Sequence, residues 1–409
     1  MRGMTETMTI GERVAFYRRR RGMAQVVLAG LVGRTEDWLS RVENTKIELD
    51  RLSVIRNLAD ALDVTLGDLV AEPALLDWTT DSGVRTVPAL RAVLMNYGLA
   101  IPALADDGDE EPPTLDDVER AVSEVFDAYQ ASRYGYVTGR APLVLSDALR
   151  AARAAGADES NRANALLALA YQSAVSVLTK LGETDLAWIA SERGLAAAQQ
   201  ADDPVVLGSL FRSVTHALHA TGRFQAGVEL AQAAADVLQP HLSSRADDAL
   251  LSVYGSLFLT GAIAASRAED RQTTTAFLAE AQESANRLGR DANAMWTAFG
   301  PTNVAIHRMT AAMELGDVQV AVDLGPRVDA SGLPIERRVR HAIETARAYS
   351  ARNRRDDALG VMLEAEQLAP EQIKHHAISR QLVLSWLRNH RGPRSVALDN
   401  LARRLHLVA

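Results

Sequence analysis

The residues best suited to chemistry lie in one stretch near the amino terminus, residues 25–46. An apolar helical period runs through residues 27–31, stops at Gly33 and resumes through residues 38–42, which predicts two short helices joined by a tight turn. Gly33 fits the left-handed position of such a turn, and Thr35 fits the N-cap of the second helix. A helix of about eight to ten residues that starts beside a glycine turn has the size that enters the DNA major groove. The chemistry expected here is hydrogen bonding to phosphates and base edges.

The polar side chains of this stretch and its flanks are the candidates for DNA contact. Gln25 opens the first helix, where free backbone amides favour a phosphate oxygen. The first turn of the second helix should face base edges, and Arg41 suits bidentate bonding to guanine. The predicted DNA-binding residues are Arg18, Arg19, Gln25, Arg34, Thr35, Glu36, Asp37, Trp38, Ser40, Arg41 and Lys46.

Several of these side chains have a structural alternative. The acids at 36–37 complement the positive end of the helix dipole, and they repel phosphates unless one accepts a hydrogen bond from cytosine. Trp38 can belong to the core, and Arg41 can pair with Glu43 or Glu48. The arginine run at 18–21 predicts a phosphate-facing edge, with a solvated face as the alternative.

The segment as a whole resembles the helix-turn-helix domain of the Xre/Cro-like repressor family. The matching residues are Gly11, Arg13, Arg18, Gly22, Gln25, Leu28, Ala29, Gly33, Ser40, Arg41, Glu43, Leu52, Leu58, Ala59 and Leu69. The resemblance implies a lambda-repressor-like bundle of five helices that binds operator DNA. Ala24 departs from the usual capping Ser or Thr, which should weaken a helix cap by about 0.5–2 kcal/mol. Thr45 stands where glycine usually ends the recognition helix.

The charge is unevenly divided along the chain, whose net charge is −8. Residues 1–70 carry 11 Lys and Arg against 10 Asp and Glu, a net charge of +1, whereas the remainder has a net charge of −9. A DNA-binding domain that is nearly neutral should bind DNA with modest affinity as a monomer, because phosphate neutralisation supplies most of the sequence-independent affinity. We therefore expect a homodimer that joins two half-sites.

The composition argues against several classes of protein. The chain contains no cysteine, which excludes disulfides, iron–sulfur clusters and thiolate zinc sites and suits a reducing cytoplasm. It shows no signal-peptide core and no stretch of about 20 uncharged apolar residues. No phosphate loop, GxGxxG, nucleophile elbow or HExxH motif occurs, and the histidine pairs lack a third ligand at fixed spacing. We expect a cytoplasmic protein that is not an enzyme, without metal or cofactor and without a membrane partner.

Residues 72–113 are predicted to connect two domains. They hold five of the 13 prolines and end in the acidic run 106–111, which is typical of a solvated loop. One helix is expected near residues 88–97, with an apolar face against the following domain. The predicted domains are residues 1–71, 72–113 and 114–409.

The third segment is helical in pattern, without strand signals. Helix pairs recur roughly every 34–45 residues, as in an α-solenoid. The clearest pair, residues 210–240, resembles a tetratricopeptide repeat (TPR) through Gly222, Ala226, Ala231 and Pro240. The expected fold is all-α, with a five-helix helix-turn-helix domain followed by a solenoid of TPR-like pairs. The chain resembles actinobacterial Xre-type regulators with a C-terminal TPR-like domain.

Polar side chains on the first helices of such repeats line the concave face. Asn303 and His307 lie four residues apart, on one helical face, and an asparagine amide can both donate to and accept from a ligand backbone. Pro301 is expected to bend or begin a helix and so to open space for a ligand. The residues predicted to bind an effector are Asn164, Tyr171, Arg212, His216, His219, Asn303 and His307. Each has an alternative as a cap, a helix bridge or a solvated residue.

Two functions fit these features. The first is a sequence-specific DNA-binding transcriptional regulator, a homodimer whose TPR-like domain binds a small-molecule or peptide effector or a partner protein. The second is a TPR adaptor whose N-terminal bundle contacts protein, an alternative that the acids at 36–37 keep open. DNA binding should fall steeply with ionic strength, and a protein contact of mixed polarity should not.

Overall fold

The computed structural model describes residues 8–70, 86–96, 111–242, 247–389 and 395–408, and every regular element in these ranges is a helix. The all-α fold expected from the sequence is confirmed. The N-terminal bundle comprises α1 (Ile10–Arg20), α2 (Gln25–Leu31), α3 (Glu36–Glu43), α4 (Leu52–Leu62) and α5 (Leu66–Val70). It is followed by α6 (Thr86–Leu94).

The N-terminal bundle is organised around the crossing of α1 and α3. A capping box begins α1: the Thr9 hydroxyl accepts from the amide of Glu12, whose carboxylate accepts from the amide of Thr9. Gly11 lies on the face of α1 that meets α3, where a Cβ atom would come within 2.0 Å of the carbonyl oxygen of Val42. The two helices therefore approach each other only because residue 11 has no side chain.

A Gly11→Ala variant should separate α1 from α3 and destabilise the bundle by about 1–3 kcal/mol or more, because the added methyl group meets rigid backbone. Faster hydrogen exchange of the α1 and α3 amides would show this. Gly30→Ala is the matched control, because a Cβ atom at Gly30 meets nothing within 4 Å. That variant should be neutral or stabilising by up to about 1 kcal/mol. Equal exchange in the two variants would contradict the prediction.

The rest of the chain forms successive helix hairpins. Their short turns use left-handed residues such as Gly182 (φ 77°) and Gly222 (φ 72°), which end one helix and start the return. The hairpin helices are α8 (Leu115–Gln130), α9 (Tyr134–Ala154), α10 (Ser160–Leu181), α11 (Thr184–Gln200), α12 (Pro204–Ala220), α13 (Phe224–Leu238), α14 (Asp248–Arg267), α15 (Arg271–Leu288), α16 (Pro301–Glu314), α17 (Val318–Leu324), α18 (Ile335–Ala351) and α19 (Arg355–Leu368). Single turns lie at η3 (Gln239–His241), η4 (Ala294–Trp296) and η5 (Gly325–Arg327), and the C-terminal helices are α20 (Pro370–His375), α21 (Ala377–Asn389) and α22 (Val396–Arg404).

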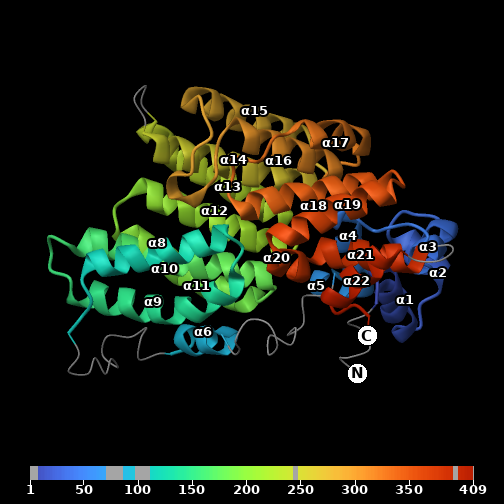
Figure 1. The fold of residues 1–409 in the computed structure, drawn as a ribbon, viewed down its shortest axis with the longest axis horizontal. Helices are drawn as coiled ribbons and strands as arrows, with labels where there is room; N and C mark the ends of the chain where they lie inside the picture. Colours follow the sequence, from blue (N-terminus) through green and yellow to red (C-terminus); the bar gives the residue numbers. More distant parts are fainter. Residues whose placement is uncertain (1–7, 71–85, 97–110, 243–246, 390–394, 409) are drawn as a thin grey trace.

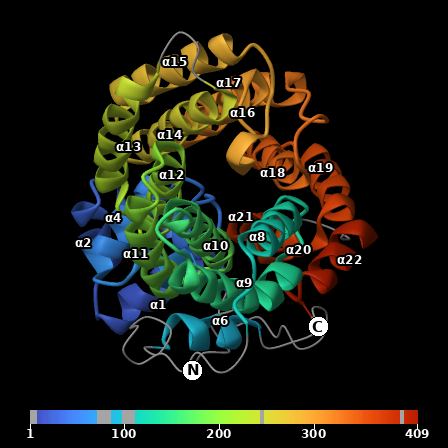
Figure 2. The ribbon, with the colours of Figure 1, turned by 90° about the vertical axis from the view of Figure 1, so that its left-hand side faces the viewer.

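The hairpins wind into a superhelix whose two ends meet (Figure 2). The segment before α16 crosses to α8, where Trp296 stacks on Phe126 with ring centroids 4.3 Å apart. In the turn after α8, Ser132 donates to the side chain of Gln372 in α20 at 2.7 Å. Helices that are distant in sequence therefore surround one central bore.

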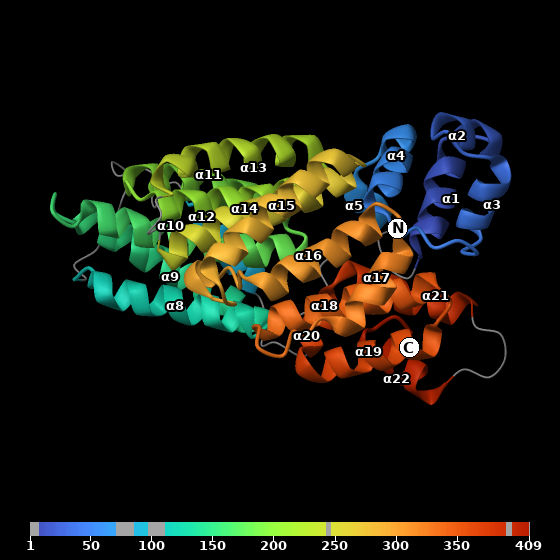
Figure 3. The ribbon, with the colours of Figure 1, turned by 90° about the horizontal axis from the view of Figure 1, so that it is seen from above.

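The N-terminal bundle docks on the superhelix through one side only. Figures 1 and 3 place α2 and α3 at the end of the molecule farthest from α8 and α9. The docked side includes Arg51, which donates to the carbonyl oxygen of Glu314 at 2.9 Å, and Ser53, which donates to Glu269 at 3.0 Å. Asn389 of α21 donates to the carbonyl oxygen of Thr45 at 2.8 Å.

The helix expected in the connector is α6, and it buries Leu90 and Leu94 in the core cluster that α9 and α10 share. Pro301 is the first residue of α16, so of the two alternatives predicted for it, a bend or the start of a helix, the second is correct. Most of the acidic run 106–111 lies outside the described residues. Within the described part, one helix is long and apolar enough to cross a membrane, α14; 89% of its apolar window is buried inside the molecule, so this is weak evidence for a span.

Candidate functional site

The turn between α2 and α3 has the geometry of a helix-turn-helix. Gly33 adopts φ +64°, and the amide of Arg34 donates back to the carbonyl oxygen of Ala29 at 2.8 Å. Thr35 caps α3, its hydroxyl accepting from the amide of Trp38 at 3.2 Å. These bonds fix the angle between the two helices.

A buried ionic cluster holds α3 against α1 and α2. Arg18 grips the carboxylate of Glu43 with two hydrogen bonds of 2.5 and 2.7 Å, and it donates to the carbonyl oxygen of Met23 at 2.7 Å. Gln25 donates to the same carboxylate at 2.8 Å. The expectation that Arg18 faces a phosphate is therefore wrong, because its guanidinium donates its hydrogen bonds to Glu43 and Met23 inside the bundle. Gln25 also holds α3 with the side chain that was expected to reach DNA.

The remaining predicted DNA contacts lie on the outer face of the bundle. Trp38 is half-buried against the bundle core, and the Arg34 guanidinium carbon lies 5.6 Å from the centre of its ring. Arg41 pairs with neither candidate acid, since Glu48 accepts hydrogen bonds from the superhelix instead. Ser40 is half-buried, and the exposed residues are Arg19, Arg34, Thr35, Glu36, Asp37, Arg41 and Lys46.

The two departures from the family pattern have visible consequences. Ala24 occupies the N-cap of α2 and gives its amides no side-chain acceptor. Thr45 adopts φ 57°, the left-handed conformation that glycine favours, and so ends α3 despite its β-branched side chain. The bundle tolerates both residues.

Comparison with known proteins agrees with this geometry. Residues 9–72 match the family model described as a helix-turn-helix domain. The chain carries a helix-turn-helix domain. A comparison with curated proteins finds no match. Among solved structures, BtubC (BKLC) from P. vanneervenii is similar at 15% identity, over 68% of this chain and 95% of that one, with a TM-score of 0.38, a value too low to establish a shared fold.

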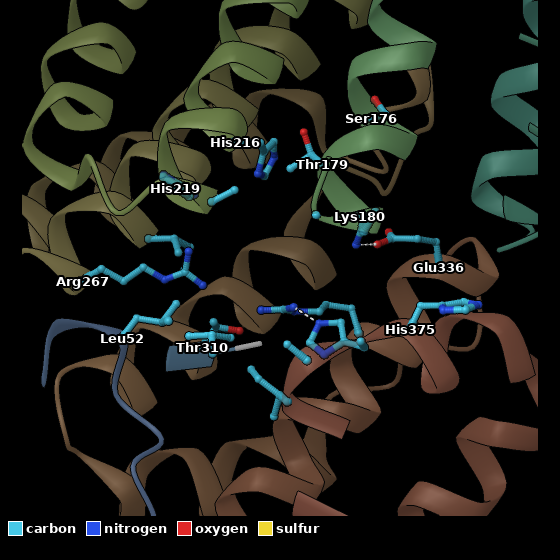
Figure 4. Close-up of a pocket in the computed structure, with 18 of the residues that line it drawn as sticks. Leu52, Ser176, Thr179, Lys180, His216, His219, Arg267, Thr310, Glu336 and His375 are labelled. Atoms are coloured by element: carbon cyan, nitrogen blue, oxygen red, sulfur yellow. Dashed lines mark hydrogen bonds and ion pairs between the residues drawn. The ribbon is translucent and has the colours of Figure 1, made fainter. Parts of the chain in front are cut away.

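A cavity of about 380 Å³ lies in the bore of the superhelix, and the helix-turn-helix domain forms part of its wall (Figure 4). The volume is within the range of small-molecule sites. The domain contributes Ile10, residues 48–50, Leu52, Ile55, Leu66, Gly67 and Val70. A ligand in this cavity would thus touch the superhelix and the DNA-reading domain together.

The structure places four of the seven predicted effector residues in the cavity wall: Arg212, His216, His219 and His307. The other three lie elsewhere. Asn164 bonds to the carbonyl oxygen of Ser160 within its own helix, and Tyr171 is buried in the core formed by α8 to α12. Asn303 is 1% exposed and does not line the cavity. The expected break before α16 does line the cavity, through Trp296 and Ala298.

Burial sets the charge of the cavity histidines. It lowers the pKa of His307 and of His375 to about 3, and it lowers the pKa values of His216, His219 and His376 well below 6.5. All five imidazoles line the cavity in the neutral form at pH 7.

Acidification should therefore destabilise the protein. These histidines take up protons at about pH 6.5 in the unfolded chain and much lower in the folded one, so their stabilisation is complete above pH 6.5 and falls below it. For each histidine, the free energy of unfolding falls by on the order of 1 kcal/mol at pH 5.5. Burial raises the pKa values of Glu48 and Asp50, which offsets part of this loss.

Differential scanning fluorimetry between pH 7.5 and 5.5 should show a falling Tm, and His307→Gln should make the fall smaller. A flat profile, or an unchanged slope in the variant, would contradict the assignment of neutral buried histidines.

Proposed function

We propose that the chain is a sequence-specific DNA-binding transcriptional regulator whose cavity binds an effector that controls the helix-turn-helix domain. The observation that carries the proposal is the two-sided position of that domain. Thr35 at the N-cap of α3 and the first helical residues, Glu36 and Asp37, are exposed, while Leu52, Ile55 and Leu66 on the opposite side line the cavity. One small domain thus touches the space for the ligand and presents the surface for DNA.

The coupling in this proposal is a shift of population. A ligand that bridges superhelix and domain stabilises the docked arrangement, because it has more contacts there than in any undocked one. We further propose that the chain acts in the cytoplasm by binding rather than catalysis and that its hairpins are TPR-like. In a homodimer, docking would set the separation of two α3 helices against half-sites about 34 Å apart.

The test begins with DNA sites selected by the full chain from a random pool. Arg41→Ala should weaken binding to the selected site about 10- to 100-fold in fluorescence anisotropy, as expected for an arginine that reads a base (~1–3 kcal/mol). Arg403→Ala, at an exposed arginine of α22, should bind as the parent does. Failure to select any site, or equal binding by the two variants, would defeat the proposal.

A second function, that of an adaptor that contacts protein through its N-terminal bundle, is favoured by one observation. Val26, Val27 and Leu31 of α2 are 57%, 49% and 62% exposed and form an apolar patch beside the DNA-facing surface. Ionic strength separates the two functions. Binding to DNA should weaken steeply between 50 and 200 mM salt, by orders of magnitude if several phosphates are neutralised (on the order of 10³-fold for six contacts), whereas an apolar protein contact should change little.

A further inference from the structure

The wall of the cavity carries more positive than negative groups. Its acids are Glu48, Asp50 and Glu336, and its cations are Lys180, Arg212, Arg267, Arg337, Arg340 and Arg347. Because the five cavity histidines are neutral, they do not change this balance. Burying a net positive charge is unfavourable unless an anion accompanies it.

Most of these cations already have partners. The ion pairs are Lys180–Glu336 (2.5 Å), Arg267–Glu314 (3.4 Å), Arg347–Glu314 (3.3 Å), Arg347–Glu344 (3.1 Å), Arg347–Asp50 (3.8 Å) and Arg340–Glu344 (2.8 Å). Arg212 makes no ion pair within the described part of the chain. Among the described carboxylates Arg337 reaches only that of Glu336, at 3.8 Å, and Lys180 already holds this carboxylate more closely. The Nε atoms of both Arg212 and Arg337 are buried without a hydrogen-bond partner.

Arg212 and Arg337 line the same cavity, and the charge of Arg337 affects the pKa of Arg212. Burial lowers the pKa of Arg212 to about 10, and the charge of Arg337 is the next largest cause. The charge of Arg212 also helps to lower the pKa of His216, one turn away on α12, after burial. Figure 4 shows His216, Thr179 and Lys180 around this space. Both guanidinium groups line this cavity, where their positive charges repel each other and the imidazole of His216 is neutral.

We propose that the cavity binds a small organic anion, with its acidic group between Arg212 and Arg337 and its apolar body against the helix-turn-helix domain. A carboxylate, phosphate or sulfonate offers the paired oxygens that guanidinium groups bind bidentately. His216 and Thr179 add hydrogen-bonding atoms beside this position, and the buried Thr179 hydroxyl oxygen has no partner of its own.

The apolar body has a matching surface. Leu52, Ile55, Leu66 and Val70 of the helix-turn-helix domain line the cavity together with Ile263 and Ile306 of the superhelix. A ligand with an anionic head at Arg212 and an apolar body on these side chains connects the two parts of the molecule. This inference rests on the proposed function for its regulatory meaning, but its test uses no DNA, so each can fail without the other.

Two fluorescent probes of similar shape test the anion site in the full chain. 1-Anilinonaphthalene-8-sulfonate carries an anionic group, and N-phenyl-1-naphthylamine lacks it. We expect the sulfonate to bind the parent protein at least tenfold more tightly. Arg212→Met should weaken the sulfonate at least tenfold and leave the neutral probe within twofold, because methionine keeps the apolar volume. Arg271→Met, at an exposed arginine paired with Asp317, should leave both probes unchanged.

Stability provides the second measurement. If Arg212 is an uncompensated cation held for a ligand, Arg212→Met should have a Tm equal to or higher than that of the ligand-free parent, and the sulfonate should raise the Tm of the parent more than that of the variant. A lower Tm in the variant would assign Arg212 a structural role and overturn the proposal. Equal sulfonate affinity in parent and variant, or an equal loss for both probes, would also overturn it.

Discussion

An Arg18→Met variant should lose the local stability of the helix-turn-helix domain and with it the binding of DNA. Arg18 and Glu43 form a buried bidentate pair whose side chains are 10% and 3% exposed. Removing one partner of such a pair typically costs about 3–5 kcal/mol, because the other charge stays buried without compensation. Among the described residues, Gln25 alone would then donate to the Glu43 carboxylate, so α3 would lose its ionic link to α1 and keep only the packing around Gly11.

Hydrogen exchange across α1 to α3 and DNA anisotropy measure the two parts of this result. Arg19→Met is the matched control one residue away, since Arg19 is exposed; it should keep parental exchange and lose only the affinity of one phosphate contact. The double variant Arg18→Met, Glu43→Leu should recover much of the stability, because apolar residues of similar volume can replace a buried ion pair. Normal exchange together with weak DNA binding in Arg18→Met would show that Arg18 touches DNA after all.

The helical period of α1 could have predicted this buried ion pair, although the run of four arginines at 18–21 favoured a phosphate-facing edge. Ile10, Val14 and Arg18 recur every four residues, so they lie on the inward stripe of α1. Glu43 directly follows Val42 on the buried face of α3. Opposite charges on two inward faces predict a buried pair, whereas residue type alone predicts a phosphate contact.

Local features of the fold could be predicted because they depend on near neighbours. The glycine turn at Gly33 and the cap at Thr35 are properties of a few consecutive residues. The helix hairpins follow in the same way from apolar period and turn residues. The closure of the superhelix and the docking of the N-terminal bundle do not follow from local sequence, because they join residues far apart in the chain. Ser132 and Gln372, for example, lie 240 positions apart.

The cavity was predicted in part for the same reason. Arg212, His216 and His219 were predicted to bind an effector, and the structure places all three on α12 in the wall of the bore. Helical spacing also grouped Asn303 with His307, but of these two residues only His307 lines the cavity, because spacing does not determine what packs against each side chain. That the helix-turn-helix domain itself forms part of the wall required its position on the superhelix.

Replacing Arg347 with methionine should have the largest effect on the attachment of the helix-turn-helix domain. Arg347 is 1% exposed, and its guanidinium donates to Glu314 at 3.3 Å, to Glu344 at 3.1 Å and to the carbonyl oxygen of Asp50. Burial raises the pKa of Glu314, but the charges of Arg347 and Arg267 more than offset it and lower the pKa overall. Without Arg347, two buried carboxylates keep only weaker compensation, and the loss should be about 3–5 kcal/mol.

The loss should appear first where Arg347 meets the domain. Hydrogen exchange of residues 45–56 should accelerate before that of α8 to α12, because these residues hold the docked side and the superhelix hairpins do not depend on Asp50. Arg352→Met, which removes an exposed arginine that donates to Gln319 in the same region, should leave exchange at residues 45–56 unchanged. Arg347→Lys should recover little, because an ammonium group cannot bridge several acceptors as a planar guanidinium does. Uniform acceleration of exchange throughout the superhelix would instead show that Arg347 stabilises the core in general. The cavity would then be linked to the helix-turn-helix domain through the apolar contacts of Leu52 and Leu66.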